Sequence, residues 1–371
     1  MKITRIETLP VLVPINPKVA IRSSRGIHTV SPFLFLKLHT DEGVIGLGEV
    51  SGTLEWSGED HVTAVHIIRS CFEPLLVGRN PLEIEKRSTE LQECVAGNPF
   101  TKAGIEMALW DILGKAAGLP LYRLLGGPVR EQVPLKFSVS GLAPDAAAEI
   151  AAWAVEQGFK TLKVKVGTDP EQDVARVKAV RSAVGPGIRL GIDANGGWSP
   201  RTAIATIRRL YEYNVYFAEQ PVKPHDPTWM ADVRKNIEIP VLADESVNTL
   251  HDAMALVRAG AADVFSIYVG KGAGIGTARK IAVVAEAAGL GCTVGSNLEL
   301  GVASAAMIHL AMATPGVHAE DFPCDILCPF LYEHDLLVEP LDIRDGRACP
   351  SERPGLGVEL DDTQVARFLV A

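Results

Sequence analysis

Two lysines stand two positions apart in a short apolar segment, T-L-K-V-K-V-G at residues 161–167. In an extended strand, Lys163 and Lys165 point to the same side of the backbone. Two ammonium groups held that close lower each other's pKa, and a lysine brought near neutrality can act as a general base. A K-x-K pair by itself is more often a solvated strand edge, so its meaning depends on the residues that follow it.

Acidic residues follow this pair at a regular spacing. They open three tripeptides, Asp193-Ala194-Asn195, Glu219-Gln220-Pro221 and Asp244-Glu245-Ser246. The leading carboxylates are 26 and 25 residues apart, which is one strand–helix unit each. A single Asp would more often cap a helix, but three carboxylates on adjacent strands repel one another unless a cation neutralises them. Because such oxygen ligands suit Mg²⁺, Asp193, Glu219 and Asp244 are predicted to bind one Mg²⁺.

The elements that must position these residues form a repeat from about residue 133 onward, in which β-branched runs alternate with alanine-rich helical stretches. The expected strands are residues 136–140, 161–166, 189–193, 215–219, 241–244, 264–269, 292–294 and 318–321. Strands connected by helices pair in parallel, and about 190 residues suit a closed barrel better than an open sheet. The lysines and acids fall at the carboxyl ends of their strands, which form the active-site face of such a barrel.

The chain divides at about residue 130. Before this point, strand-like segments are followed by a helical pattern at 102–117, which Gly118-Leu119-Pro120 ends. We therefore predict an α+β capping domain over residues 1–130 and a barrel over 131–327. The remaining segment, 328–371, is rich in Pro and Gly and is expected to return to the capping domain.

With these motifs in place, the whole chain resembles the enolase superfamily, and within it the muconate-lactonizing-enzyme subgroup. The resemblance also includes Gly46-Leu47-Gly48-Glu49, Gly104-Ile105-Glu106-Met107-Ala108-Leu109-Trp110-Asp111, Gly118-Leu119-Pro120 and Leu124-Leu125-Gly126-Gly127. It implies an α/β fold, a modified (β/α)7β TIM barrel with an α+β cap, and Mg²⁺-assisted abstraction of a proton beside a carboxylate. Lys165 would be the base, and a charged Lys163 would hydrogen-bond the substrate carboxylate.

The position of the second base departs from the subgroup's pattern. In its racemases and cycloisomerases a second lysine usually ends the sixth strand, 24 residues after the last metal-binding Asp, and this position is Tyr268 here. Lys271 lies three positions later, an odd offset that turns it to the opposite side of a continuing strand unless the register shifts. A phenol of ordinary pKa, near 10, is a poor base at neutral pH but can donate a proton. The alternative is a Tyr268 that only packs in the barrel mouth.

A single strong base favours elimination over reversible proton transfer, which needs a competent base on each face. The Lys–Tyr pairing resembles that of the cis-3-hydroxy-L-proline dehydratases of this superfamily. We therefore predict a Mg²⁺-dependent hydro-lyase that converts cis-3-hydroxy-L-proline to Δ¹-pyrroline-2-carboxylate. Two alternatives stay open: a racemase, epimerase or cycloisomerase that uses Lys165 with Lys271 or Tyr268, and a non-catalytic binding barrel.

Several further side chains are candidate substrate contacts. Trp56, in a cap loop, can face an ammonium group through its ring, and Asp321, at the expected eighth strand, can pair with that group. Asn195 follows its strand, and Ser296, after the expected seventh strand, is as typical of a helix cap as of a substrate contact. Lys271 completes the set.

Composition excludes other classes of function. The net charge of −9 argues against a nucleic-acid surface, because phosphate binding needs a basic face. No stretch reaches the roughly 18 apolar residues of a membrane span, and the six cysteines are too scattered for a disulfide framework. We expect a cytoplasmic homo-oligomer whose partner is a small-molecule carboxylate and not a nucleic acid or a membrane.

Overall fold

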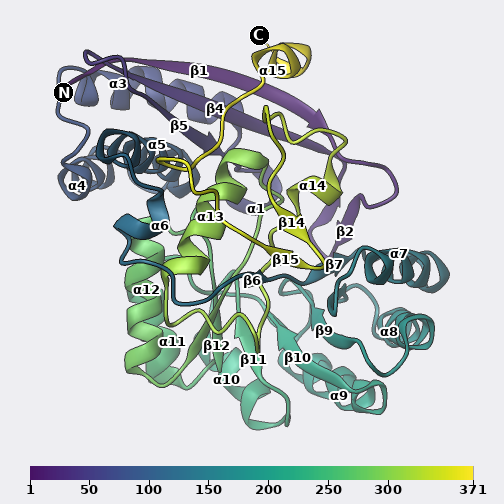
Figure 1. Ribbon diagram of the computed structural model, residues 1–371. Coiled ribbons are helices and arrows are strands. Elements are labelled where there is room, and N and C mark those ends of the chain that lie inside the picture. Colours follow the sequence, from purple (N-terminus) through teal and green to yellow (C-terminus); the bar gives the residue numbers. More distant parts are fainter. Residues whose placement is uncertain (371) are drawn as a thin grey trace.

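The computed structural model describes residues 1–370, which form a barrel covered on one side by a sheet and helices (Figure 1). The cap begins with an antiparallel sheet in the order β1-β4-β5. Its strands are β1 (Ile3–Pro14), β4 (Val30–Thr40) and β5 (Ile45–Val50). A small hairpin, β2 (Ile21–Ser23) with β3 (Gly26–His28), leaves the sheet between β1 and β4. The cap helices are α1 (Leu54–Ser57), α2 (His61–Ile67), α3 (Glu73–Leu76), α4 (Ile84–Cys94), α5 (Pro99–Ala117) and α6 (Leu121–Leu124), with a π-helical turn at Ile68–Phe72.

Glycines let helix α5 lie directly against strand β5. A Cβ atom on Gly48 would stand 1.9 Å from the carbonyl oxygen of Gly104, and one on Gly46 would stand 2.2 Å from that of Ala108. Both distances are far below van der Waals contact, so any side chain at these two strand positions would push the helix away. The glycines of the G-L-G-E segment are therefore a packing requirement of the cap.

The barrel wall consists of parallel strands. Within residues 1–370, seven strands follow one another in the sheet in the order in which they occur in the chain. They are β7 (Phe137–Val139), β8 (Thr161–Lys165), β9 (Arg189–Asp193), β10 (Val215–Glu219), β11 (Val241–Ala243), β12 (Val264–Ile267) and β13 (Gly291–Val294). The predicted modified (β/α)7β barrel is thereby confirmed.

The connecting helices begin where local sequence signals place them. These helices are α7 (Pro144–Glu156), α8 (Pro170–Val184), α9 (Pro200–Leu210), α10 (Pro227–Lys235), α11 (Leu250–Ala259), α12 (Ile275–Ala287) and α13 (Gly301–Ala313), with a 3-10 turn at Tyr211–Tyr213. Helices α7 to α10 each start with a proline, and Asp169, Ser199, Asp226 and Thr249 cap α8 to α11. Proline at the first helical position and Ser, Thr or Asp before it are the residues that favour helix initiation.

The barrel closes through a segment other than the predicted strand at residues 318–321. The chain touches β13 at Val317, turns away, and returns so that Cys324 pairs with Leu135 next to β7. The backbone N–H of Asp325 then donates to the carbonyl of Val294 at 2.8 Å. The predicted position of the eighth strand was therefore wrong, because residues 318–321 form a turn that is exposed except at Ala319, and the residues that join the barrel wall are the buried ones after it.

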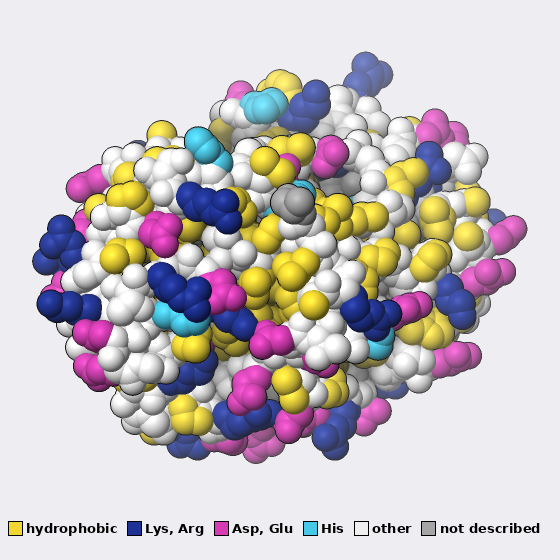
Figure 2. Space-filling view, turned by 90° about the horizontal axis from the view of Figure 1, so that it is seen from above, with side chains coloured by type: hydrophobic (Ala, Val, Ile, Leu, Met, Phe, Trp, Pro, Cys, Tyr) yellow, Lys and Arg dark blue, Asp and Glu magenta, His cyan; other side chains and the backbone are white. Residues whose placement is uncertain are grey.

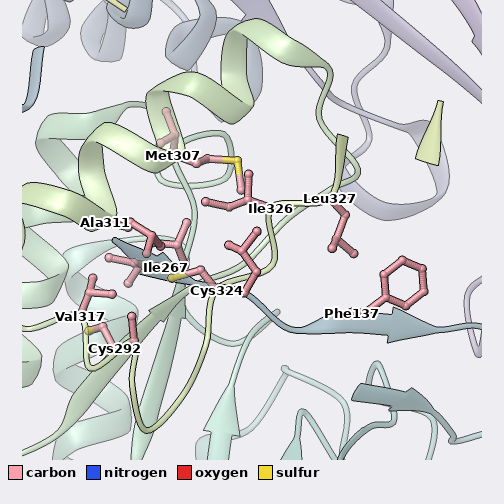
Figure 3. Packing of buried hydrophobic residues seen from close by; sticks show 14 of the residues in the cluster. Phe137, Ile267, Cys292, Met307, Ala311, Val317, Cys324, Ile326 and Leu327 are labelled. Atoms are coloured by element: carbon pink, nitrogen blue, oxygen red, sulfur yellow. The ribbon is translucent and has the colours of Figure 1, made fainter. Parts of the chain in front are cut away.

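Figure 3 shows why the closing segment lies where it does. Cys324 and Ile326 point into a cluster that also contains Ile267, from β12, and Met307 and Ala311, from α13. The side chains of Cys324 and Ile326 are fully buried. Their removal from water stabilises the closed barrel far more than the polar residues of the preceding turn could.

Carboxylates of the cap complete the amino-terminal ends of two barrel helices. Glu106 of α5 accepts hydrogen bonds from the first two N–H groups of α12, at 2.8 and 2.9 Å. Glu49 of β5 accepts from Leu300 and Ala303 at the start of α13, at 2.7 and 2.9 Å. The residues that precede these helices, Gly274 and Leu300, supply no side-chain cap of their own. The cap thus satisfies N–H groups that the barrel leaves free.

The C-terminal segment contacts both parts of the molecule. It contains α14 (Cys328–Leu331), β14 (Ile343–Arg344), β15 (Arg347–Ala348) and α15 (Asp362–Phe368). Strand β15 pairs with β6 (Val133–Pro134) at the start of the barrel, and Leu369 bridges to Val11 of β1. Figure 1 shows α15 beside the cap sheet.

The surface above the cap sheet mixes charges of both signs. Figure 2 shows apolar side chains near the centre of this face, with basic and acidic side chains interspersed around them. Among the described residues, no helix is both long and apolar enough to cross a membrane.

Candidate active site

The barrel brings the predicted lysines and acids to one end of its strands. Lys163 and Lys165 lie on β8, and Asp193 and Glu219 are the last residues of β9 and β10. Lys165 is the register partner of Asp193, and Asp193 is that of Glu219. Asp244 directly follows β11. The regular spacing in the sequence therefore becomes adjacency in space, because each repeat contributes one neighbouring strand.

The two lysines of β8 bind different sets of oxygens. The Nζ of Lys163 lies 2.8 Å from Oε1 of Glu219, 2.7 Å from Oδ2 of Asp325 and 3.2 Å from Oδ2 of Asp193. The Nζ of Lys165 donates to Oδ2 of Asp193 at 2.6 Å and to the side-chain carbonyl of Asn195. Lys163 is buried, whereas Lys165 retains some exposure at the cavity.

The environment fixes the charge of Lys163. Burial on its own would lower the pKa of the ammonium group, but the surrounding carboxylates, Asp325 foremost, raise it well above the usual range. Burial opposes ionisation of Asp193 in the same way, and the two lysines beside it nevertheless hold the pKa of that carboxyl below its usual range. Lys163 is thus a fixed cation, as the sequence argument requires of the group that meets a substrate carboxylate.

Two buried carboxylate oxygens at the mouth lack a partner. Within residues 1–370, no hydrogen-bond donor reaches Oε2 of Glu219 or Oε2 of Glu245. Burial raises the pKa of both carboxyls to about 7, with the charges of Asp193 and Asp244 adding to the shift. Unpaired buried carboxylate oxygens beside further carboxylates are the donor set that a hard divalent cation prefers.

Lysine side chains separate the carboxylates of Asp193, Glu219 and Asp244. In the part of the chain that the structure describes, no three Asp, Glu, His or Cys side chains approach closely enough to enclose a metal ion. Ammonium groups lie between them instead, with Lys163 and Lys165 on Asp193 and Lys271 on Asp244. The oxygen chemistry fits a divalent cation, and the ligand set Asp193, Glu219 and Asp244 stays a prediction.

Tyr268 faces Lys165 across the barrel. It follows β12, which is separated from β8 by three strands of the sheet, so the two residues stand on opposite walls. The phenol O–H donates to Oδ2 of Asp244 at 2.9 Å, and the ring stacks on Trp56 with a centroid distance of 5.6 Å. Burial and the charge of Asp244 raise the pKa of Tyr268 well above its ordinary value. This tyrosine therefore keeps its proton.

Lys271 reaches the site as well, contrary to the strand-alternation argument. Its Nζ lies 2.5 Å from Oδ1 of Asp244, also contacts the backbone carbonyl of that residue, and stands 4.2 Å from the ring centroid of Tyr268. The alternation fails because β12 ends at Ile267 and the chain turns before Lys271. Tyr268 and Lys271 are thus both partners of Asp244.

The sequence matches known families over both parts of the chain. Residues 5–126 match the family described as Mandelate racemase / muconate lactonizing enzyme, N-terminal domain. Residues 145–364 match the family described as Enolase C-terminal domain-like. The chain belongs to the enolase superfamily, in its muconate-lactonizing-enzyme subgroup.

Several relatives of this enolase-superfamily enzyme are isomerases. The chain is 33% identical over 371 residues to N-succinyl-L-Arg/Lys racemase of Bacillus cereus, covering 100% of this chain and 98% of the racemase. The crystal structure of that racemase superimposes with a TM-score of 0.95, covering 100% and 99% of the two chains. Muconate cycloisomerase 1 of Rhodococcus opacus is 34% identical, with 97% and 96% covered. A dipeptide epimerase of Cytophaga hutchinsonii, solved with Mg and D-Ala-L-Val, is 32% identical, with 99% and 98% covered and a TM-score of 0.94.

The cavity of this superfamily member contains most of the proposed substrate contacts. Its volume is about 300 Å³, and Trp56, Asn195 and Ser296 line it together with Lys163, Lys165 and Tyr268. Lys271 lines a second cavity that adjoins the first at Trp56 and Asn195. These placements agree with a substrate site, and the individual contacts stay predictions.

Asp321 does not belong to the site of this enzyme. The residue is exposed, and its backbone carbonyl accepts from Arg189, at the amino-terminal end of β9 and hence at the opposite end of the barrel. Asp325 lines the cavity in its place and contacts Lys163. Sequence reasoning chose the wrong acid because it placed the eighth strand before the turn instead of after it. The signal was present in residues 323–327, where one carboxylate stands among apolar residues.

Proposed function

We propose that this enzyme is a Mg²⁺-dependent lyase that eliminates water from a small 3-hydroxylated amino or imino carboxylate. The proposed substrate is cis-3-hydroxy-L-proline, and the product is Δ¹-pyrroline-2-carboxylate. The single observation that carries the proposal is the pair of groups on opposite walls, an amine on Lys165 and a phenol on Tyr268. A substrate between these walls would have a base on one face and a hydrogen-bond donor on the other.

The side chains divide the proposed reaction between them. Lys165 accepts the proton from the carbon beside the carboxylate, and Lys163 hydrogen-bonds that carboxylate while negative charge builds on it. The bond between the neighbouring carbon and its hydroxyl then breaks, and the hydroxyl leaves as water with a proton from Tyr268. Hydroxide is a much stronger base than phenolate, so a phenol of raised pKa still serves as this donor. The resulting enamine tautomerises to the imine.

Asp193, Glu219 and Asp244 would hold the Mg²⁺, with the unpaired oxygen of Glu219 as the observation of this structure that favours it. The ion would supply positive charge to the substrate carboxylate, which otherwise resists a second negative charge. We expect MgCl₂ to raise the thermal unfolding midpoint of the wild-type enzyme and excess chelator to abolish turnover. Asp244→Asn should lose most of the Mg²⁺-dependent shift, and full activity in excess chelator would remove the metal from the proposal.

An isomerase is the second candidate, and the names of the relatives favour it. A racemase or epimerase needs a second base that faces Lys165, and Lys271 is the amine on that wall. Its Nζ binds the carboxylate and the backbone carbonyl of Asp244, and its side chain lines the second cavity instead of the one that contains Lys165 and Tyr268, which disfavours it as the base that faces Lys165. The geometry therefore supports the lyase better.

Incubation of cis-3-hydroxy-L-proline with the enzyme in D₂O separates the two candidates by NMR. The lyase should form the imine, and deuterium in remaining substrate should sit at C2 with retained configuration, because the same lysine returns it. Tyr268→Phe should slow water loss at least tenfold while this exchange stays measurable. Tyr216→Phe is a matched control, since its hydroxyl has no hydrogen-bond partner among residues 1–370.

The isomerase gives the opposite pattern. The lyase proposal would be contradicted by formation of the deuterated C2 epimer from proline-like or other amino-acid substrates, without loss of water from the 3-hydroxy compound. The second base would then be Lys271 or Tyr268, and the loss of inversion in Lys271→Met or Tyr268→Phe would tell them apart.

A further inference from the structure

Lys136 is a buried lysine that lies just before β7 and outside the substrate cavity. Its side chain is 1% exposed. The Nζ donates to the backbone carbonyl of Pro323 at 2.6 Å and to the hydroxyl of Thr293 at 3.4 Å. It also lies 3.3 Å from Oδ2 of Asp325. A buried ammonium group is costly unless it is paired, so this carboxylate is the natural partner of Lys136.

Asp325 connects Lys136 to the active site. The same oxygen, Oδ2, accepts a hydrogen bond from the Nζ of Lys163 at 2.7 Å, and Oδ1 accepts from the hydroxyl of Ser138 at 3.1 Å. The chain of contacts therefore runs from Lys136 through Asp325 to Lys163. Lys163 in turn reaches Glu219 and Asp193.

The orientation of Asp325 depends on both lysines. With Lys163 as its only cation, the carboxylate would be held from the other side only by the hydroxyl of Ser138 on Oδ1. Lys136 holds the same oxygen from the other side and is itself fixed by the carbonyl of Pro323. Because the substrate carboxylate must be held within a few tenths of an ångström during charge build-up, a fixed Lys163 matters most in the transition state.

We propose that Lys136 is a positioning residue, which acts through Asp325 to hold the ammonium group of Lys163 in place for the substrate carboxylate. It makes no contact with the substrate itself. The role of Lys163 rests on the proposed function, whereas the contact chain is independent of the substrate's identity.

The test compares two buried lysines that each donate to a backbone carbonyl and to a side-chain oxygen, of which only Lys136 also pairs with a carboxylate. Lys102 of α5 is also buried, and its Nζ donates to the carbonyl of Val95 at 2.6 Å and to Gln92. We expect Lys136→Met to lower kcat about thirtyfold and to change KM less than threefold, because the loss falls on the transition state. Lys102→Met should lower thermal stability but leave kcat within twofold of wild type. Lys136→Gln, which keeps a donor without the charge, serves if the methionine variant does not fold.

A double-mutant cycle tests the route through Asp325. If Lys136 acts through this residue, Lys136→Met combined with Asp325→Asn should be no slower than Asp325→Asn alone. The unfolding midpoints should show the same lack of additivity, and this readout needs no substrate. Multiplicative effects on kcat, or a kcat of Lys136→Met within threefold of wild type, would overturn the proposal.

Failure of the proposed function is distinguishable from failure of this inference. Wild-type enzyme that leaves cis-3-hydroxy-L-proline unchanged contradicts only the former. The same cycle is then measured by α-proton exchange in D₂O with an N-succinyl amino acid or a dipeptide that the wild type does exchange. If no compound of the panel exchanges, additive unfolding midpoints would still overturn the contact chain.

Discussion

Charged groups at the mouth of the barrel are buried beside groups of the opposite sign, so that each ammonium group contacts at least one carboxylate. Lys163 contacts Asp325, Glu219 and Asp193, and Lys165 contacts Asp193 from the side of the cavity. Buried charges of one sign would be too costly to keep, so the acids and the lysines depend on each other. Lys165 differs from Lys163 in retaining exposure to the cavity, and it is the lysine that can exchange a proton with a bound molecule.

Replacement of Lys165 by alanine should therefore abolish turnover. We expect a loss of more than a thousandfold in kcat, because the neighbouring amine on β8, Lys163, is held between carboxylates, while the circular dichroism spectrum is unchanged. Lys160→Ala, at an exposed position before the same strand, is the control and should behave as wild type. Activity of Lys165→Ala within tenfold of wild type, a barrier change of about 1.4 kcal/mol, would show that another group takes the proton.

At the scale of elements, the cap and the barrel share hydrogen bonds at helix ends. Helix α12 begins after a glycine without a side-chain cap, and Glu106 of α5 accepts its first two N–H groups and the indole N–H of Trp110. A fully buried acceptor of this kind both orders the helix and fixes the angle between the two parts of the molecule.

Glu106→Ala should lower the free energy of unfolding by about 3 kcal/mol. The variant leaves buried N–H groups without acceptors, and hydrogen bonds to charged groups contribute roughly 1.5–3 kcal/mol each. Urea unfolding followed by tryptophan fluorescence measures the change. Glu286→Ala, at an exposed position on α12, should stay within about 0.5 kcal/mol of wild type. Equal stability of the two variants would contradict the capping role of Glu106.

At the scale of the whole molecule, His309 joins three parts of the chain. It lies on α13, and its Nδ1 accepts from the backbone N–H of Tyr122 at 3.2 Å. Its Nε2 lies 3.1 Å from the carbonyl of Leu356, to which it donates. The neutral imidazole satisfies both bonds, whereas a protonated ring would place a proton on the nitrogen that must accept. Burial accordingly lowers the pKa of His309 to about 4.

This shift predicts how stability depends on pH. Between pH 6.5 and 4 the unfolded chain binds a proton at this position and the folded protein does not, so stability falls as the pH is lowered. The contribution of His309 amounts to about 3 kcal/mol across this range. His309→Gln should flatten the pH dependence of the unfolding free energy between pH 7 and 4.5, while His251→Gln, on the exposed face of α11, should leave it unchanged. An unaltered slope in the His309 variant would contradict the prediction.

The sequence was sufficient for seven strands of the barrel and for most of its mouth. Hydrophobic periodicity, prolines at helix starts and one polar residue at each strand end are local signals, and a repeated strand–helix unit turns them into neighbouring positions. Lys163, Lys165, Asp193, Glu219 and Asp244 could therefore be found from spacing alone. Because neighbouring strands pair in parallel, these side chains must lie together at one end of the barrel, whatever the conformation of the loops.

Residues outside regular strands were decided only by the tertiary structure. Lys271 follows a turn, so alternation along β12 does not apply to it, and Asp325 lies in a segment that the barrel captures through only isolated bridges. Lys136 lies at a strand start, where sequence offers no reason to expect a charge beneath the site. The acceptors for α12 and α13 likewise come from residues about 170 and 250 positions away. The local sequence pattern determines which residues form a strand or a helix. The partner of a buried charge or of a free N–H group depends on which residues the packing brings within hydrogen-bond distance. These contacts form only in the folded chain, so they could not be predicted from the sequence.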